Sequence, residues 1–146
     1  IIKDGAKMVN AMANSVVPKF TIVMGNSYGA GNYAMCGKAY DPRLIVAWPS
    51  AKIAVMGGSQ AAKVLLQIQV ASLKSKGEKI DPRREKALLT EIEDRYKKQT
   101  TPYNAAERFW VDANIEHLET RKNITMGNED ANNGEVEKFN PGVIQT

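Results

Sequence analysis

The sequence has few of the side chains that most often carry chemistry. Its 146 residues include one cysteine, one histidine and 7% aromatic residues. The single cysteine, Cys36, cannot form an internal disulfide, which is typical of a reducing compartment, and we expect a cytoplasmic protein. No apolar run approaches the roughly 18 residues that predict a membrane span. No local group of His, Cys, Asp and Glu residues predicts a metal site.

What the sequence does contain is ordinary for a globular protein. Hydrophobic residues make up 43% and charged residues 25% of the chain, and the length fits one domain with a sizeable core. The net charge is +4, from 20 basic and 16 acidic residues. The densest basic segment, 74–86, also contains Glu78, Asp81 and Glu85. It therefore predicts a solvated linker and helix face and no nucleic-acid partner.

The first residues indicate part of a longer polypeptide. The chain opens on Ile1 without an initiator methionine, and residues 1–7 lack the basic and apolar regions of a signal peptide. Apolar residues then recur at helical spacing from Met8 to Val16. We therefore expect the chain to begin inside or just before a helix, as a segment of a longer protein does.

Periodicity and turn residues predict the order of the elements. The predicted segments are a helix ending before Val17-Pro18, a strand over 19–24, a glycine-rich turn over 25–31, a short helix over 32–39 ended by Asp41-Pro42, strands over 43–48 and 52–56, helices from Ser59 to about Lys76 and from Asp81-Pro82, a third helix from Thr101-Pro102 that includes Trp110, and a loop region beyond Gly127. Apolar residues cover most of the circumference of the Ser59 helix, which predicts burial on most sides. Two successive strands before a helix differ from simple βαβα alternation.

The glycine-rich turn matches a nucleotide-binding pattern only in part. Residues 29–34 read Gly-Ala-Gly-Asn-Tyr-Ala, which fits the G-x-G-x-x-A dinucleotide fingerprint after a strand and before a helix. That fingerprint needs an acidic residue about 20 positions later for the ribose, and no acid occurs between Asp41 and Glu78. A phosphate-binding loop is excluded because no Gly-Lys-Ser/Thr follows.

The same turn also matches the nucleophile elbow of serine hydrolases. Residues 25–29 read Gly-Asn-Ser-Tyr-Gly, and the chain order Ser27, Asp112, His117 is that of α/β-hydrolases. Ala30-Gly31 weakens the helix that an elbow serine should enter, and His117 lies in a charged stretch typical of the surface. A triad is defined by geometry, so this interpretation needs the three side chains to meet in space.

A third interpretation uses the backbone alone. Glycine lets successive N–H groups face a ligand without obstruction by a Cβ atom, and such donors at a helix N-terminus stabilise developing negative charge. This needs no acid, base or metal nearby, which fits the lack of a His, Cys, Asp or Glu cluster in residues 18–40. The alternative is that the glycines only turn the chain and let the short helix pack closely. The residues by themselves leave both open.

Residues 25–43 carry a resemblance that favours the backbone interpretation. The run Gly-Asn-Ser-Tyr-Gly-Ala-Gly-Asn-Tyr-Ala-Met-Cys-Gly-Lys-Ala-Tyr-Asp-Pro-Arg resembles the C-terminal half of the carboxyltransferase β subunit of acyl-CoA carboxylases, first the methylcrotonyl-CoA type and then the propionyl-CoA type. Further matches are Trp48 to Ile53, Val55 to Ala62, Thr101 to Ala106 and Leu118 to Lys122. The resemblance runs from about residue 5 to 126 and is densest over 25–62.

The resemblance implies an α/β fold of the crotonase-like ββα spiral type. This chain then forms a partial C-terminal carboxyltransferase domain (residues 1–126) followed by a surface tail (residues 127–146). In that family an N-terminal half binds the acyl-CoA, a C-terminal half receives carboxybiotin, and the active site forms where halves of different subunits meet. The implied partners are the N-terminal carboxyltransferase half, further copies in a homo-oligomer such as a hexamer, and the biotin carboxylase and biotin carrier subunits.

The resemblance also implies a role for the residues of the turn. The residues implied to bind biotin are Tyr28, Gly29, Ala30, Gly31, Asn32 and Tyr33. For Tyr28, Asn32 and Tyr33, packing in the core or at an interface is the alternative that stays open. Backbone N–H groups of Ala30 and Gly31 form the biotin-side oxyanion hole, and Gly29 sets the turn. They stabilise the charge on the ureido oxygen when carboxybiotin loses CO2; biotin then accepts the α-proton of the acyl-CoA, and the enolate attacks CO2. The implied activity is carboxyl transfer between carboxybiotin and an acyl-CoA.

Two other functions stay open. A sodium-pumping acyl-CoA decarboxylase of the glutaconyl-CoA type runs the transfer in reverse on a related fold, and the sequence of this half does not separate the two. A non-catalytic assembly segment that folds against partner chains is the alternative of another class. By itself the chain is expected to be inactive and to expose an apolar face from the Ser59 helix and Phe109-Trp110.

Some residues near the C-terminus depart from the family pattern. Asn114, Asn123 and Asn128 stand where aliphatic residues are expected, and Glu116-His117 stands where the family has Asp-Pro. A buried asparagine costs free energy unless it is hydrogen-bonded. These departures bear on the packing of the C-terminal segment and leave the glycine-rich turn unaffected.

Overall fold

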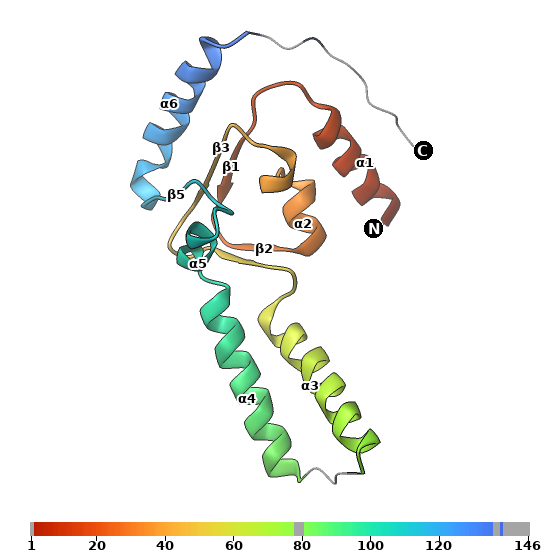
Figure 1. The fold of residues 1–146 in the computed structure, drawn as a ribbon. Helices are drawn as coiled ribbons and strands as arrows, with labels where there is room; N and C mark the ends of the chain where they lie inside the picture. The colour runs from red at the N-terminus through yellow and green to blue at the C-terminus, as the bar shows by residue number, and fades with distance from the viewer. Residues whose placement is uncertain (1, 78–80, 136–137, 139–146) are drawn as a thin grey trace.

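Two long antiparallel helices project from a body of parallel strands and short helices in the computed structural model of the chain (Figure 1). The structure describes residues 2–77, 81–135 and 138. In chain order the elements are α1 (Ile2–Asn14), β1 (Phe20–Val23), β2 (Asn26–Tyr28), α2 (Gly29–Ala34), the 3-10 helix η1 (Lys38–Tyr40), β3 (Leu44–Ala47), β4 (Lys52–Ala54), α3 (Gly58–Ser75), α4 (Pro82–Gln99), α5 (Pro102–Glu107), β5 (Ala113–Asn114), the 3-10 helix η2 (His117–Glu119) and α6 (Thr120–Asn132).

The strands of the described residues pair in parallel. β3 is the central strand of a three-stranded sheet, with β1 and β5 on either side, and Ile45 of β3 lies opposite Thr21 of β1. β2 and β4 form a separate two-stranded sheet in which Tyr28 lies opposite Ala54. The continuous apolar run of β3 predicts a strand buried on both faces, and Ile45 is only 1% exposed.

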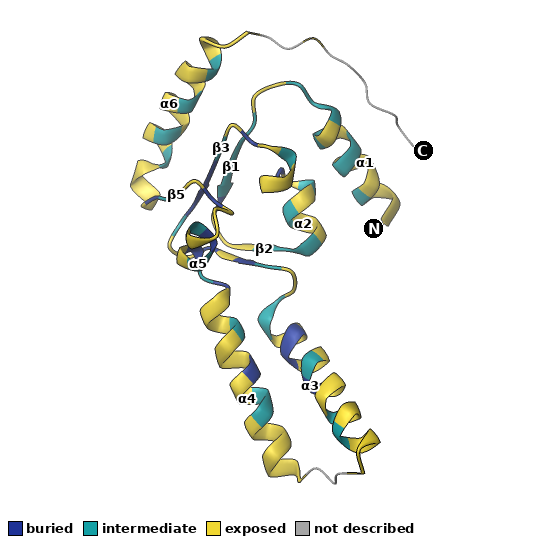
Figure 2. Ribbon diagram, in the orientation of Figure 1, coloured by how far each residue is buried: buried dark blue, intermediate teal, exposed yellow. Residues whose placement is uncertain are grey.

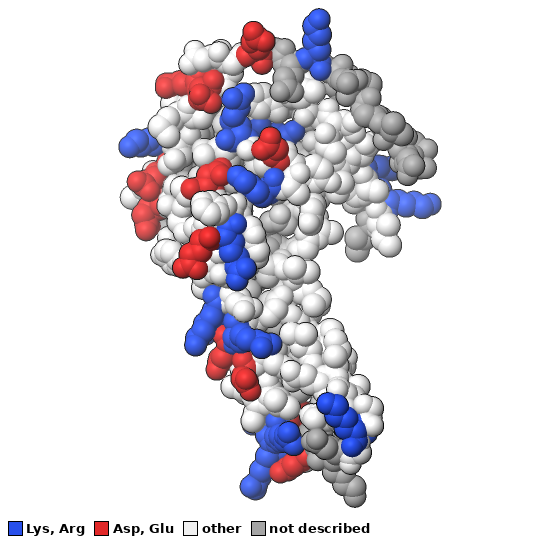
Figure 3. All heavy atoms as spheres, viewed as in Figure 1, with Lys and Arg blue, Asp and Glu red and all other residues white. Residues whose placement is uncertain are grey.

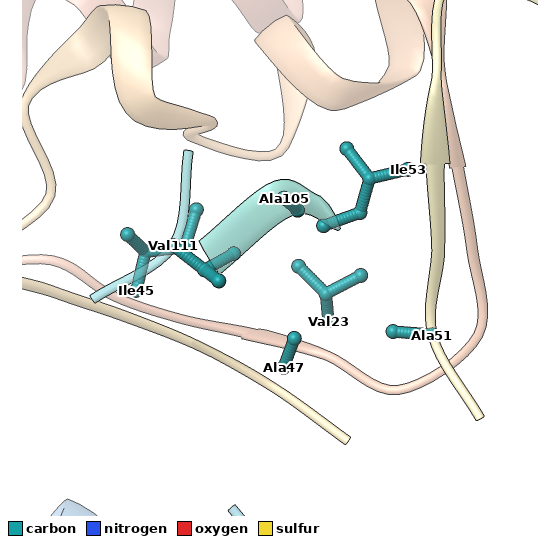
Figure 4. Close-up of a cluster of buried hydrophobic side chains, with 7 residues drawn as sticks. All are labelled: Val23, Ile45, Ala47, Ala51, Ile53, Ala105 and Val111. Atoms are coloured by element: carbon teal, nitrogen blue, oxygen red, sulfur yellow. The ribbon is translucent and has the colours of Figure 1, made fainter. Parts of the chain in front are cut away.

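The main core lies where β1, β3, β4 and α5 approach one another (Figure 4). The buried side chains that pack together there are Val23, Ile45, Ala47, Ala51, Ile53, Ala105 and Val111. Three of the seven are alanines, whose small side chains let backbone segments approach closely. As a result α5 contacts both β4 and β5 directly.

α3 and α4 bury a second, smaller group of apolar side chains between them. Ala62, Leu66 and Ile92 are buried there, with Leu65, Val70, Leu88 and Leu89 packed around them. The start of α4 follows the prediction, because the Asp81 side chain accepts the N–H of Arg83 and Pro82 takes the first helical position. This group is separate from the main core, so the two helices hold each other by their own contacts.

The apolar circumference of α3 is only partly covered. Val64 is 42% exposed and Ile68, one turn later, is 60% exposed, while Ala62 and Leu66 are buried. Figure 2 shows exposed residues along much of both projecting helices. The prediction that α3 is buried on most sides is therefore wrong for the chain by itself. The predicted exposure of apolar side chains is confirmed both on α3 and at Phe109, which is 81% exposed.

The surface carries charges of both signs. In the view of Figure 3, basic and acidic side chains lie interspersed on the body and along α4. The described residues of the segment 74–86 are exposed, as a solvated linker and helix face requires, and Glu78 lies outside the described residues. Of the helices that the structure describes, none is both long enough and apolar enough to cross a membrane.

Three predicted boundaries around the glycine-rich turn are wrong. Residues 26–28 form β2 and not a turn, because they pair with β4. The short helix begins at Gly29 and ends at Ala34, before Asp41-Pro42, because Cys36 has a left-handed φ of 59° that a helix cannot continue. α3 begins at Gly58 with Gly57 at the N-cap, so Ser59 is not the capping residue.

The C-terminal region also differs from the prediction. α5 ends at Glu107, short of Trp110, because Phe109 has a left-handed φ of 57°. α6 crosses Gly127 and continues to Asn132, so the predicted loop is wrong for those residues. Gly127 lies against the Phe20 ring, where a Cβ would come within 2.7 Å of a ring carbon. Residues 136–137 and 139–146 of the predicted surface tail lie outside the described residues.

Asp112 connects the segment before β5 to η1 and β3. Its Oδ1 accepts a hydrogen bond from Lys38 Nζ at 2.7 Å, and its Oδ2 accepts one from the backbone N–H of Ile45 at 2.9 Å. Burial by itself raises the pKa of Asp112, but the hydrogen bonds from Lys38 and Ile45 and the charge of Lys38 lower it below the usual range. The folded chain therefore favours the ionised carboxylate.

Replacing Asp112 is expected to destabilise the chain in a pH-dependent way. At neutral pH, Asp112→Ala should lower the free energy of unfolding by about 1–3 kcal/mol, because the buried N–H of Ile45 is left without an acceptor. Since the folded-state pKa lies below the unfolded one, the carboxylate contributes above about pH 4 and loses its contribution as the pH falls further. Urea denaturation at neutral pH and at about pH 3 measures both effects.

Asp4→Ala is the matched control for this prediction. It removes a carboxylate paired with Lys7 at 3.7 Å on the exposed surface of α1. Surface substitutions of this kind change stability by about 0.5 kcal/mol or less. Equal losses for Asp112→Ala and Asp4→Ala, or a gap between Asp112→Ala and wild type that widens in acid, contradict the role assigned to Asp112.

Candidate functional site

The glycine-rich turn joins the end of β2 directly to the start of α2. Gly29, at the junction, has a φ of 50°, and a Cβ there would lie 2.8 Å from the carbonyl oxygen of Val55. A left-handed φ strains residues other than glycine, and the nearby carbonyl leaves no room for a side chain. Gly29 therefore sets the direction in which the chain enters α2.

The next two residues carry backbone donors without helical acceptors. Ala30 and Gly31 are the second and third residues of α2, and the first N–H groups of a helix have no partner within it. Tyr28, the N-cap residue, makes no side-chain cap hydrogen bond. Ala30 and Gly31 are exposed, and apart from its chain neighbours and its own helix nothing described lies within 4 Å of the position that a Cβ on Gly31 would take. The turn thus places two adjacent N–H groups without helical acceptors at exposed residues.

A second strand-to-helix junction lies next to the first. Because β2 and β4 are parallel neighbours, both leave the sheet at the same edge, β2 into α2 and β4 through residues 55–57 into α3. A Cβ on Gly57, the N-cap residue of α3, would lie 3.7 Å from the Tyr28 ring. The N-cap of α3 also lacks a side-chain cap hydrogen bond. Two helix N-termini therefore lie at one edge, and their dipoles favour negative charge there.

The tyrosines predicted to line the site differ in their surroundings. Tyr33 is 51% exposed, and its ring meets the edge of the Tyr40 ring with 6.2 Å between centroids. Tyr28 is half-buried, and its hydroxyl donates to Asn26 Oδ1 at 3.2 Å. Tyr33 therefore presents the more open ring, whereas Tyr28 lies between the turn and Gly57.

Asn32, also predicted to line the site, uses its side chain within the chain. Its amide Nδ2 donates to Ser27 Oγ at 2.8 Å, across the boundary between β2 and α2. Its Oδ1 lies so close to Gly37 that a Cβ there would overlap it. Sequence reasoning missed the hydrogen bond between Asn32 and Ser27 and also the approach of the Val55 carbonyl to Gly29. A separation of five residues across a strand–helix boundary follows neither helical nor strand periodicity, so no pattern signals it.

A shallow hollow of about 490 Å³ adjoins the turn. Tyr28, Lys52, Ser59, Lys97 and Thr101 are among the residues that line it. A larger hollow of about 810 Å³ lies between the end of α1, the segment 40–43 and the end of α6. Of the six predicted site residues, only Tyr28 lines the smaller hollow and none lines the larger one, so the smaller hollow touches the turn at Tyr28 alone.

The structure does not bring the predicted serine-hydrolase residues together as a triad. Ser27 Oγ accepts its hydrogen bond from Asn32. Asp112 is used in the contacts with η1 and β3 described above. The His117 ring packs edge-on against Trp48, with 4.5 Å between centroids. Each of the three side chains is engaged elsewhere, so the geometry does not support the hydrolase interpretation.

The chemistry of the turn is that of its backbone. Residues 26–34 contain no Asp, Glu, His, Lys, Arg or Cys. In the described part of the chain, no group of three or more His, Cys, Asp or Glu side chains is placed to hold a metal ion. Cys36, just after α2, is free and buried. The arrangement can therefore stabilise negative charge by hydrogen bonds and helix dipoles, but it has no proton acceptor of its own.

Comparison with known sequences relates these residues to one family. The carboxyl transferase domain family matches residues 1–142. The mitochondrial methylcrotonoyl-CoA carboxylase beta chain of Dictyostelium discoideum is 44% identical over 126 residues, which are 86% of this chain and 21% of that protein. The chain spans about a quarter of the length of the curated relatives that it matches.

Solved structures share the fold. The beta subunit of geranyl-CoA carboxylase from P. aeruginosa superimposes with a TM-score of 0.79 at 37% identity, covering 97% of this chain and 26% of that one. Transcarboxylase 12S gives a TM-score of 0.78 at 33% identity, covering 100% of this chain and 26% of that one. The expected α/β fold of crotonase-like carboxyltransferases is therefore confirmed.

Adding a side chain at Gly29 is expected to destabilise the chain. Gly29→Ala places a Cβ at a left-handed φ and against the Val55 carbonyl, so the free energy of unfolding should fall by at least about 1–2 kcal/mol. Gly31→Ala is the control, because its Cβ meets open space within a helix, and it should leave stability unchanged or raise it by up to about 1 kcal/mol. Urea denaturation followed by circular dichroism measures both. Similar effects of the two substitutions contradict this account of the turn.

Proposed function

Because this chain belongs to the carboxyl transferase domain family, we propose that it supplies the biotin-side half of an active site that transfers a carboxyl group between carboxybiotin and an acyl-CoA. The observation that carries the proposal is the exposed start of α2 at Ala30 and Gly31, whose N–H groups have no helical acceptor and no side-chain cap. Backbone donors held in a fixed position are what an oxyanion hole requires.

The turn stabilises negative charge and does not itself transfer protons. When bound, biotin carries the carboxyl group and supplies a ureido oxygen that becomes negative as that group leaves. The N–H groups of Ala30 and Gly31 donate to this oxygen and lower the energy of its charge. The N-termini of α2 and α3 at the same edge add a favourable potential. Since the donors belong to the backbone, they need little reorganisation during the reaction.

The residues of the turn fit a flat ring that gains negative charge. No acidic side chain in residues 26–34 repels that charge. Gly31 leaves room in front of the turn, and the exposed ring of Tyr33 offers an apolar surface beside it. We assign Tyr28 and Tyr33 to the walls of the biotin slot, with Asn32 at its base and Gly29 setting the turn.

The acyl-CoA requires residues beyond this chain. The turn has no base, and the chain matches only 26% of transcarboxylase 12S, whose structure is a hexamer assembly with hydrolysed methylmalonyl-coenzyme A bound. We infer that an N-terminal carboxyltransferase half binds most of the acyl-CoA, and that the site is completed between copies in a homo-oligomer. Biotin carboxylase and biotin carrier subunits are the partners that bring biotin to it.

Two alternatives share the same features. Decarboxylation in a sodium-pumping acyl-CoA decarboxylase uses the same charge stabilisation in reverse, so the turn favours neither direction. A non-catalytic assembly segment is compatible with the exposed apolar face of α3 and with Phe109. The paired N–H groups at Ala30 and Gly31 favour a catalytic role over that alternative. The cytoplasmic location and the division at residue 127 stay predictions.

Removing one donor is expected to impair transfer severely. In a complete carboxyltransferase subunit that contains this domain, Gly31→Pro deletes one N–H group and should lower kcat by about 10²–10³-fold. Proline is best tolerated at the first position of a helix and Gly31 is the third, so circular dichroism has to show that the fold of the variant persists. Ala30→Gly keeps its N–H and should change kcat by no more than about threefold, as expected when no donor is lost. Carboxyl transfer from methylmalonyl-CoA to free biotin measures both variants.

Full activity of the Gly31→Pro subunit, with an unchanged circular dichroism spectrum, overturns the assignment of the hole. The isolated chain of 146 residues provides a second test. It should transfer no carboxyl group to free biotin, because the proposed acyl-CoA half is missing from it. Turnover by the chain by itself contradicts the half-site proposal.

A further inference from the structure

We propose that Ser27 and Asn32 form a positioning pair that holds the N–H groups of Ala30 and Gly31 in the orientation needed for carboxyl transfer. The inference rests on the proposed function of the turn. It gives Ser27 a role that is neither nucleophilic nor purely structural, and it makes the side chain of Asn32 a support of the site.

The pair closes the turn from both sides. Ser27 lies in β2 opposite Ile53 of β4, so its backbone position is set by the sheet. Asn32 lies in α2, immediately after the two donor residues. The hydrogen bond from Asn32 Nδ2 to Ser27 Oγ, at 2.8 Å, therefore encloses residues 28–31 and ties the first turn of α2 to the strand before it.

Asn32 is itself held on its far side by Gly37. The backbone carbonyl of Asn32 accepts the N–H of Gly37 at 2.8 Å. Gly37 also approaches Asn32 Oδ1 so closely that any Cβ at position 37 would overlap it. The amide of Asn32 is thus confined between Ser27 and Gly37, with little freedom to rotate towards a ligand. Its contribution to the site is to fix the backbone around it.

α2 needs such support because it is short. It has six residues, and its N-cap residue Tyr28 provides no side-chain hydrogen bond. Helices of this length are not stable by their own hydrogen bonds, since nucleation is costly and few bonds follow it. Without the pair, the first turn can shift or fray and carry the two donors with it. Displacing a catalytic group by about 1 Å can cost roughly a hundredfold in rate.

The sequence motif around Ser27 has a different explanation on this basis. Ser27 fits the G-x-S-x-G pattern, yet its oxygen accepts from the Asn32 amide, and the ring of His117 packs against Trp48. A serine at this place supplies a small acceptor at the end of a strand, within reach of the helix that follows. The pair thus accounts for both polar residues that flank the glycines.

The test uses the complete carboxyltransferase subunit and free biotin as the acceptor. Ser27→Ala and Asn32→Ala should each lower kcat about tenfold to a hundredfold, with KM for the acyl-CoA unchanged. The double variant should lose no more than the larger single loss, because both substitutions remove the same hydrogen bond. Ser27→Thr keeps the acceptor oxygen and should restore most of kcat.

Asn123→Ala is the matched control. It removes an asparagine side-chain bond of similar length, from Asn123 Nδ2 to the carbonyl of Glu119 at 2.9 Å, in a helix remote from the turn in sequence. Its kcat should equal that of wild type. If Ser27 and Asn32 only stabilise the fold, then Ser27→Ala, Asn32→Ala and Asn123→Ala each lose activity in proportion to their loss of melting temperature. That result contradicts the positioning role.

The outcomes separate this inference from the proposed function. If Gly31→Pro abolishes transfer while Ser27→Ala and Asn32→Ala keep kcat within about twofold, a change too small for a displaced catalytic group, the positioning pair is wrong and the oxyanion hole stands. Additive losses in the double variant also overturn the pair. If Gly31→Pro is fully active, the proposed function fails. If Asn32→Ala does not fold, the two Ser27 variants decide. An unchanged kcat in Ser27→Ala refutes the pair, and so does a kcat of Ser27→Thr that is no higher than that of Ser27→Ala.

Discussion

The parallel pairing of β2 with β4 is the constraint on which the candidate site depends. Because parallel strands end at the same edge, this one pairing brings two strand-to-helix junctions together and puts the N-termini of α2 and α3 side by side. It also places the Val55 carbonyl against Gly29 and the Tyr28 ring against Gly57. An isolated two-stranded sheet is weak by itself. It persists here because Ala51 and Ile53 join the main core next to Ala105.

The chain has two clusters of apolar side chains, and they differ in how fully they are buried. The group around β3 is well closed, with Ile45, Val46 and Ala47 almost inaccessible. The group between α3 and α4 covers only one side of each helix, and Val64 and Ile68 are left open. Apolar patches that remain exposed on a protein usually mark contacts with other surfaces. The proposed site therefore lies at the junction between a closed body and a pair of helices that lack cover on one side.

The sequence predicts the elements with strong local signals and misses those set by distant contacts. β3, β4, α3 and α4 carry apolar runs, helical spacing or a capping Asp-Pro, and all four are present. β2 has no such signal, since Asn26 to Tyr28 become a strand only by pairing with residues 52–54. α5 stops early because Phe109 adopts a conformation that local preference disfavours. Gly29, Ala30 and Gly31 form the first residues of α2, where the prediction has the end of a turn before a helix from residue 32. The Ser27–Asn32 bond and the Val55 contact do not follow from any spacing.

The backbone origin of the two proposed donors has a consequence for how such a site is detected. Alanine scanning replaces side chains and leaves every N–H group in place, so a scan across residues 28–33 reports the supports of the site and stays blind to the donors. At position 30 the chain already has alanine, and the scan makes no change at all. Only a change in the main chain itself, such as a proline or a backbone ester in place of the amide, removes the N–H groups of Ala30 and Gly31 and so tests them. A substitution at position 30 that keeps the N–H group likewise changes the side chain and leaves the proposed donor in place.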